Sequence, residues 1–200
     1  GLGTIDFNKV IPMPAELMIE SGYESRKGLA AYMGFIDVYT LAGTRRDADL
    51  DSIPEESEAA FLKTRTDITP RQWALGKAAF QNVCKYGAPT WYEWSIENWG
   101  TKWNAYDHGR AELSEGVARL CFLTAWSAPH PVIGRLASLY PEVEFIHGWA
   151  DENIGQNCGR CEYREGRCIE AVELENDADA VSYAQRLWGF EQGDDMEFEM

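Results

Sequence analysis

The sequence predicts an α+β fold in which helices cover one face of a mainly antiparallel sheet. Two observations carry this prediction. Before Trp91 the apolar residues follow short helical patterns broken by glycines and prolines, whereas after it they tend to alternate with a period of two. One helical segment also lies between two strand-like segments. A helical half followed by a sheet-forming half is typical of the α+β class.

The N-terminal half is expected to be a mainly helical insertion over residues 15–87. Its clearest helix is Arg71–Lys85. Thr69 is a suitable N-cap, Pro70 suits the first helical position, and Gly87 ends the pattern. The rest of this half is expected to form irregular helical hairpins.

The C-terminal half, residues 91–190, is expected to form the sheet, with one crossover helix and one C-terminal helix. The expected elements are a strand at Trp99–Asp107, a central strand at Ala118–Trp126, a helix at Val132–Tyr140, a strand at Glu142–Ala150, a hairpin at Cys161–Leu174 turning at Glu165–Gly166, and a helix capped by Asp177 or Asp179. Together with the insertion, these elements are expected to make a single domain over residues 1–200.

The charge of the chain bears on its partners. The net charge is −15, and residues 142–200 hold 16 acids against 4 bases, a balance of −12. A protein that binds a phosphate backbone needs clustered lysine and arginine, so direct nucleic-acid binding is not expected. The acidic quarter is either a solvated face or a surface that mimics phosphates. Because no apolar run approaches the roughly 20 residues of a membrane span, we expect a cytoplasmic protein without a membrane partner.

Three stretches carry a family resemblance. These are "DFNKVIPMP" (Asp6–Pro14), "ENWGTKWNAYD" (Glu97–Asp107) and Thr124–Gly159, which contains "TAWSAPHPVI" and "YPEVEFIHGWADENIGQNCG". They resemble the YubB ferredoxin-like domain family of phage, plasmid and bacterial proteins. The resemblance implies a βαββαβ topology, hence a ferredoxin-like antiparallel sheet with helices packed on one face and an N-terminal helical insertion. It implies neither an iron–sulfur cluster nor an established activity.

The tryptophan-rich stretch is the first candidate site. As a strand, it would place Trp99 and Trp103 on one face and Lys102, Asn104 and Tyr106 on the other. Two readings stay open. In one, the tryptophans pack under helices, and Asn104 and Asp107 satisfy backbone groups at the strand end.

In the other reading, Lys102, Asn104 and Tyr106 meet Trp126 and the loop of Asp151 and Asn153 in a polar, aromatic ligand pocket. That loop concentrates oxygen atoms, but it lacks the acid pattern of a calcium loop, so a turn is the better explanation.

The five cysteines do not suggest a disulfide framework. Cys84 and Cys121 are expected to be buried and inert. Cys158, Cys161 and Cys168 are weak zinc candidates that lack an evident fourth ligand; the alternatives are a Cys161–Cys168 cross-strand disulfide or free thiols. We expect no cofactor. None of the three histidines has a nucleophile at a recognisable offset, so an enzyme is not expected either.

The sequence therefore favours an acidic binding or accessory protein of a mobile element or bacterium, with a protein as its partner. One alternative is a DNA-mimic inhibitor of a restriction or defence protein. A second alternative is a small-molecule-binding protein or enzyme, with a pocket lined by Lys102, Asn104, Tyr106, Trp126 and Asp151.

Overall fold

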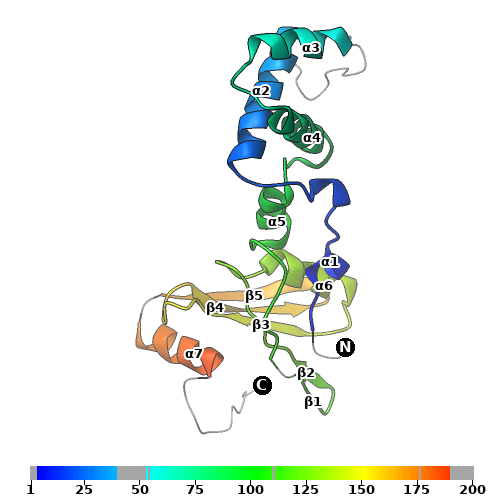
Figure 1. Ribbon diagram of the computed structural model, residues 1–200. Coiled ribbons are helices and arrows are strands. Elements are labelled where there is room, and N and C mark those ends of the chain that lie inside the picture. Colours follow the sequence, from blue (N-terminus) through cyan, green and yellow to red (C-terminus); the bar gives the residue numbers. More distant parts are fainter. Residues whose placement is uncertain (1–3, 40–52, 54, 110, 176, 190–200) are drawn as a thin grey trace. The chain divides into compact units, whose positions relative to one another are not determined.

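The computed structural model describes residues 4–39, 53, 55–109, 111–175 and 177–189 (Figure 1). Its helices are α1 (Phe7–Val10), a short 3-10 helix (Ala15–Leu17), α2 (Tyr23–Tyr39), α3 (Glu55–Thr64), α4 (Pro70–Tyr86), α5 (Trp91–Trp99), α6 (His130–Leu139) and α7 (Ala178–Trp188). Its strands are β1 (Glu112–Ser114), β2 (Val117–Arg119), β3 (Phe145–Trp149), β4 (Cys158–Arg164) and β5 (Arg167–Leu174). Helices and antiparallel sheets thus give the predicted α+β class.

The chain folds as two compact units. One is the helical unit Met13–Glu97, and the other combines Gly1–Pro12 with Asn98–Met200 and contains both sheets. The helical unit covers the predicted insertion and extends beyond it at both ends. The expectation of a single domain over residues 1–200 stays a prediction.

The helical unit is held together by an unusually close contact between α2 and α4. A Cβ placed on Gly28 would lie 1.9 Å from the Gln72 carbonyl oxygen, and one on Gly76 would lie 2.1 Å from the Gly28 backbone. The two backbones therefore touch where the helices cross, as only glycine permits. Around this crossing the core is aromatic, and Tyr32 packs on Trp73 with ring centroids 5.1 Å apart.

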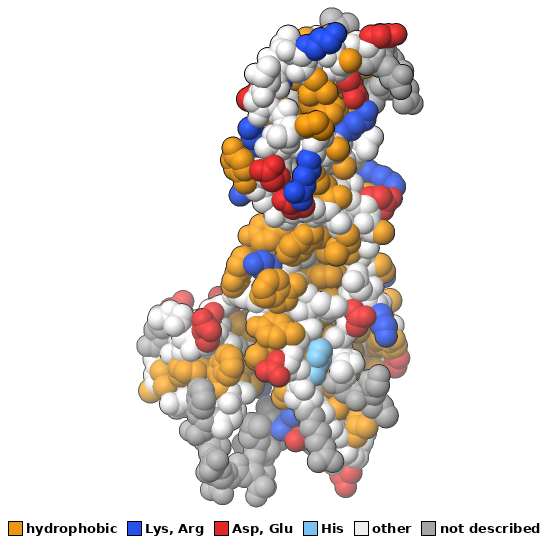
Figure 2. All heavy atoms as spheres, viewed as in Figure 1, with side chains coloured by type: hydrophobic (Ala, Val, Ile, Leu, Met, Phe, Trp, Pro, Cys, Tyr) orange, Lys and Arg blue, Asp and Glu red, His pale blue; other side chains and the backbone are white. Residues whose placement is uncertain are grey.

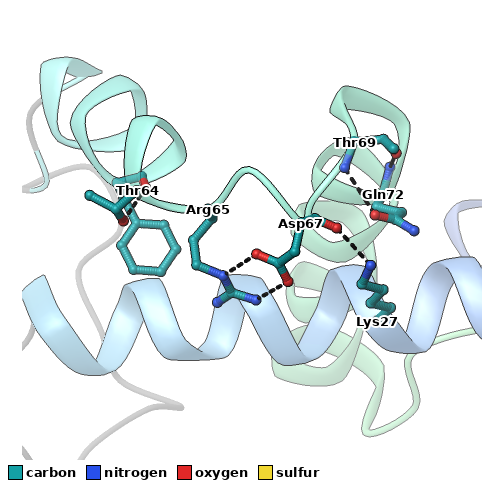
Figure 3. A network of polar contacts seen from close by, with 7 residues as sticks. Lys27, Thr64, Arg65, Asp67, Thr69 and Gln72 are labelled. Carbon is teal, nitrogen blue, oxygen red and sulfur yellow. Dashed lines mark hydrogen bonds and ion pairs between the residues drawn. The ribbon is translucent and has the colours of Figure 1, made fainter.

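Helix α4 begins and ends where the sequence predicts. Thr69 accepts a hydrogen bond from the Gln72 backbone at 3.1 Å, and Gln72 returns one to the Thr69 backbone at 2.9 Å, which completes a capping box. Gly87 ends the helix with φ = +80°. The preceding turn is fixed by Asp67, whose carboxylate binds Arg65 and whose carbonyl accepts from Lys27 (Figure 3).

The main sheet of the other unit has the order β3-β4-β5 and is antiparallel throughout. Phe145 lies opposite Tyr163 and His147 lies opposite Cys161, while a bulge interrupts the β4–β5 pairing after Glu162. The β4–β5 turn lies at Glu165 and Gly166, both with positive φ, as predicted for this hairpin.

The two helices that flank this sheet lie over opposite faces. Helix α6 packs Ile133 and Ala137 against Cys161 and Tyr163. Helix α7 packs against the opposite face of β4, where the Cys158 thiol lies 3.7 Å from the Ala180 carbonyl oxygen. Side chains at odd and even positions of a strand point to opposite faces, so Cys158 and Cys161 lie on different sides of the sheet. Helix α7 thus departs from the predicted arrangement with all helices on one face. The small Gly148 leaves room for it there, because a Cβ on Gly148 would lie 2.5 Å from the Tyr183 hydroxyl.

Two predicted strands are wrong. Trp99–Asp107 is not a strand: α5 extends to Trp99, and Gly100, with φ = +78°, turns the chain into an irregular loop. Ala118–Trp126 is not a central strand either, since its first two residues belong to β2 in a small hairpin whose strand residues are all exposed. The second prediction was wrong because apolar residues at both alternating sets of positions in Ala118–Trp126 are also typical of a strand that is buried on both faces.

Two buried cysteines were also predicted wrongly. Cys84 and Cys121 are both exposed. The buried stripe of α4 passes through Gln72, Gly76 and Ala79, which leaves Cys84 beside it, and Cys121 follows the exposed hairpin.

Candidate functional site

The tryptophan-rich stretch forms a loop that is fastened along its length. The Thr101 hydroxyl, buried, donates to the Ala125 carbonyl at 2.7 Å, and the Ser127 hydroxyl donates to the Gly100 carbonyl. Further along, Tyr106 and Leu123 exchange two backbone hydrogen bonds of 3.0 and 2.8 Å. These contacts hold residues 99–107 alongside residues 123–128.

The inward side of this loop binds the N-terminal segment Ile5–Ile11. The Asn104 carbonyl oxygen accepts from the Phe7 backbone at 2.8 Å, and its amide donates to the Asp6 carboxylate at 2.7 Å. The Trp99 indole donates to the Ile11 carbonyl at 2.9 Å.

Phe7 is completely buried at this junction. Its ring meets those of Trp99 and Phe122 at centroid distances of 5.9 and 6.0 Å. Asn104, predicted as a possible ligand-binding residue, is thus used to fasten one part of the chain to another. The reading in which Asn104 satisfies backbone groups therefore accounts for its contacts.

The outward side of the loop presents an aromatic–lysine cluster, defined as Lys102, Trp103 and Trp126. The Lys102 ammonium lies 4.5 Å from the ring centroids of both tryptophans, so it forms a cation–π contact with each. Trp103 is 44% exposed and Trp126 is 64% exposed. Tyr106, from the same loop, is 43% exposed.

The backbone of Trp126 is strained. It adopts φ = +72°, in the left-handed region that bulky residues rarely occupy. Such strain costs on the order of 1–3 kcal/mol and clusters at functional positions. A strained and exposed tryptophan is therefore the most unusual feature of the segment beside this loop.

The second predicted loop uses its polar groups locally. The Asp151 carboxylate accepts from the Asn153 backbone at 2.9 Å, which makes a turn, and the Asp151 carbonyl accepts from the Trp188 indole at 3.0 Å. Asp151 and Asn153 thus shape the connection from β3 to β4 and anchor the end of α7.

The clustered cysteines do not converge on one point. Cys158 and Cys161 are three positions apart on β4, so their side chains lie on opposite faces of the sheet. Cys161 does approach Cys168 of β5, with the two sulfur atoms 3.9 Å apart. Throughout the part of the chain that the structure describes, no group of three or more His, Cys, Asp or Glu residues could hold a metal ion.

A histidine pair that sequence reasoning missed lies between α6 and β3. The rings of His130 and His147 are 5.3 Å apart, and both contact Trp149. Burial, followed by the nearby His130, lowers the pKa of His147 to about 4, and burial also lowers the pKa of His130. The Nδ1 atom of His147 is buried without a hydrogen-bond partner. The alternation of "FIHGW" could have placed His147 beside Trp149, but it could not have brought in His130.

Beside Trp149 lies an open, mainly polar hollow of about 520 Å³. It is lined by Trp149, Gln156, Asn157, Cys158, Glu173, Leu174 and Glu175. None of the six predicted ligand-binding residues belongs to this lining.

The acidic quarter of the chain is partly neutralised where the structure describes it. Arg160 pairs with Glu162 at 2.9 Å and with Glu170 at 3.5 Å, and Arg164 pairs with Glu144 at 3.5 Å. Figure 2 shows acidic side chains scattered among other types, with no continuous acidic surface over the described residues on the side in view. The five acids of residues 190–200 lie outside the described residues. The side in view therefore offers no continuous acidic surface of the kind that a phosphate mimic would need.

Residues 98–196 match the model of a protein family described as the ferredoxin-like domain in Api92-like protein. The sheet-containing unit thus carries a ferredoxin-like domain, as the sequence predicts. No curated protein and no solved structure matches the chain. Among the described helices, none has both the length and the apolar character that crossing a membrane requires.

Proposed function

We propose that this chain is a binding protein that recognises a protein partner through the aromatic–lysine cluster. The observation that carries the proposal is Trp126, which is 64% exposed in a strained backbone conformation while its ring contacts Lys102. Exposed tryptophans are enriched among the residues that dominate protein interfaces.

The arrangement of the cluster favours a role in binding over that of exposed side chains without a function. Lys102 lies 4.5 Å from the ring centroids of both Trp103 and Trp126, which restrains two large apolar surfaces before any partner arrives. Pre-ordered side chains lose less conformational entropy on binding, so more of the contact energy appears as affinity.

The charge of the chain indicates the kind of partner. A net charge of −15 accelerates encounters with basic surfaces and slows encounters with acidic ones. A basic protein is therefore the partner we favour, and nucleic acid is not. The resemblance of the three stretches to the YubB family supports a role as an accessory protein of a phage, plasmid or bacterium, inside the cell.

The alternative of a small-molecule pocket around the tryptophan-rich stretch finds less support. Of its proposed lining, Asn104 binds the N-terminal segment and Asp151 shapes its own turn. A histidine-based enzyme also finds less support, because His147 is buried and its pKa of about 4 makes it a weak base near pH 7.

The test compares partner capture by four single variants. Trp103→Ala and Trp126→Ala each remove one ring of the cluster. Tyr23→Ala and Tyr140→Ala are matched controls, because these tyrosines are 67% and 50% exposed and lie outside the cluster. Proteins retained from a host-cell extract are quantified, and the strongest candidate is then purified and its Kd measured.

We expect the purified candidate to bind the wild type and both tyrosine controls alike. Loss of one anchoring tryptophan should weaken its binding at least about thirtyfold, which corresponds to the roughly 2 kcal/mol of an interface hot spot. For a basic partner, the association rate should also fall as salt is added. Binding that is equal in Trp103→Ala, Trp126→Ala and the wild type would disprove the proposal.

A further inference from the structure

Cys161 and Cys168 lie closer together than their pairing in the sheet requires. Cys161 of β4 is opposite Ala171, whereas Cys168 of β5 is opposite Tyr163, so the two cysteines are diagonal neighbours. The register shift between Glu162 and Tyr163 lies between these two pairs, and the sulfur atoms of Cys161 and Cys168 are 3.9 Å apart. To form a disulfide, the two sulfur atoms must close from 3.9 Å to about 2.05 Å.

The two thiols also differ in a way that suits stepwise oxidation. Cys168 is exposed, so a reagent in solution can reach it, while Cys161 is 8% exposed and lies beneath α6. Burial raises the pKa of Cys161, and the neighbouring Cys168 thiol raises it further. The accessible thiol therefore reacts first and the buried thiol second.

We propose that Cys161 and Cys168 are a site of reversible oxidation that closes a disulfide between β4 and β5. The oxidant is a low-molecular-weight disulfide such as oxidised glutathione. This inference is independent of the binding function proposed above.

The reaction has two exchange steps. The Cys168 thiolate attacks one sulfur of the oxidant, which breaks the oxidant's S–S bond and releases one thiolate. The Cys161 thiolate then attacks the Cys168 sulfur of the mixed disulfide and releases the second thiolate. The protein loses two electrons and two protons, and the oxidant gains them as two free thiols.

Cys158 provides a control within the same strand. It is buried on the opposite face of the sheet, where its thiol lies against the Ala180 carbonyl. It cannot reach Cys161, because their side chains point away from each other across β4. A variant without Cys158 should therefore oxidise as the wild type does.

The experiment treats the full chain with oxidised glutathione at mildly alkaline pH, blocks the remaining thiols, and digests it with trypsin without reduction. Trypsin cuts after Arg160, Arg164, Arg167 and Arg186. The disulfide therefore yields the peptide Cys161–Arg164 joined to Cys168–Arg186, two hydrogens lighter than the separate peptides. We expect this joined peptide from the wild type and from Cys158→Ser. We expect none from Cys168→Ser, whose substitution is at an exposed position and should not disturb folding.

A second readout is the melting temperature. Oxidation should raise the Tm of the wild type, and a reducing agent should restore it, because the cross-link restricts the unfolded chain. Cys168→Ser should show neither change. The inference is overturned if wild-type Cys168 stops at the mixed disulfide with glutathione, or if Cys161 pairs with a cysteine other than Cys168.

Discussion

Replacing Asn104 with alanine should weaken the attachment of the N-terminal segment to the rest of its unit. The substitution removes three hydrogen bonds, to the Phe7 backbone, the Ala105 backbone and the Asp6 carboxylate. A typical hydrogen bond contributes about 1 kcal/mol net, and orphaned partners at a partly buried site add to the loss. We therefore expect the free energy of unfolding to fall by about 2–4 kcal/mol.

The assay combines urea unfolding with amide hydrogen exchange followed by NMR. The Phe7 amide should exchange much faster in Asn104→Ala, because that amide donates directly to the side chain that is removed. Asn153→Ala is the matched control, since the Asn153 side chain is exposed and should change stability by less than about 0.5 kcal/mol.

Asn104→Asp refines the test by adding a dependence on pH. The substitution replaces the amide donor with a carboxylate that faces the Asp6 carboxylate, so one of the two pKa values should rise in the folded state. A folded-state pKa above the unfolded value contributes stability at low pH that is lost as the pH rises through it. The free energy of unfolding of Asn104→Asp should therefore be close to that of the wild type in acid and lower than that of the wild type near neutral pH. If Asn104→Asp is as stable as the wild type at neutral pH, or if the Phe7 amide keeps its protection in Asn104→Ala, the anchoring role is wrong.

Two further predictions concern the packing of helices and a buried titration. Gly28→Ala or Gly76→Ala should lower the free energy of unfolding in urea by more than about 2 kcal/mol, because each methyl group would overlap the facing backbone. Gly34→Ala is the control: it has free space in the same helix as Gly28, so it should raise the free energy of unfolding by about 0.5–1 kcal/mol. His147 is neutral in the folded protein near pH 7, because its pKa is about 4 against an ordinary 6.5. Its contribution to the free energy of unfolding is therefore complete above pH 6.5 and falls by about 3 kcal/mol as the pH drops to 4. The free energy of unfolding of His147→Leu, measured at several pH values, should lack that part of the pH dependence. An equal dependence on pH in the wild type and in His147→Leu would contradict the prediction.

The parts of the fold that the sequence predicted correctly are those that local signals determine. The capping residues Thr69 and Gly87 mark α4 because their own hydrogen bonds and backbone angles end the helix. Gly166 likewise fixes the turn between β4 and β5, and Asp177 caps α7 by accepting from the Ala180 backbone. Each of these signals acts over a few residues, so no knowledge of the remaining fold is needed.

The failures arise where distant residues decide the structure. The loop after Trp99 has the alternating pattern of a strand, but its Asn104 binds Phe7, which is 97 positions away. The left-handed conformation of Trp126 has no local signal, because tryptophan does not favour it. The pairing of His130 with His147 likewise depends on how α6 packs over β3.

The structure brings together some of the predicted site residues and separates others. Lys102 and Trp126 do meet, as the pocket reading required of them. Asn104 instead anchors the distant residues Asp6 and Phe7, and Asp151 forms a turn with the Asn153 backbone. Polar side chains that satisfy backbone groups have the same sequence signature as polar side chains that bind ligands, so composition alone cannot separate the two.

Under the binding function proposed above, the tryptophan-rich stretch would divide its residues between two tasks. Trp99, Thr101 and Asn104 face inward and fasten neighbouring segments, one of which is the Asp6–Pro14 stretch that also carries the family resemblance. The stretches Asp6–Pro14 and Glu97–Asp107 are thus joined by several hydrogen bonds within the fold, which give Asn104 and Trp99 a structural role. The residues to which the proposal assigns recognition are the outward-facing ones, Lys102 and Trp103 together with Trp126. If Asn104→Ala loses stability and Trp126→Ala loses partner binding while keeping its stability, the two tasks are separate.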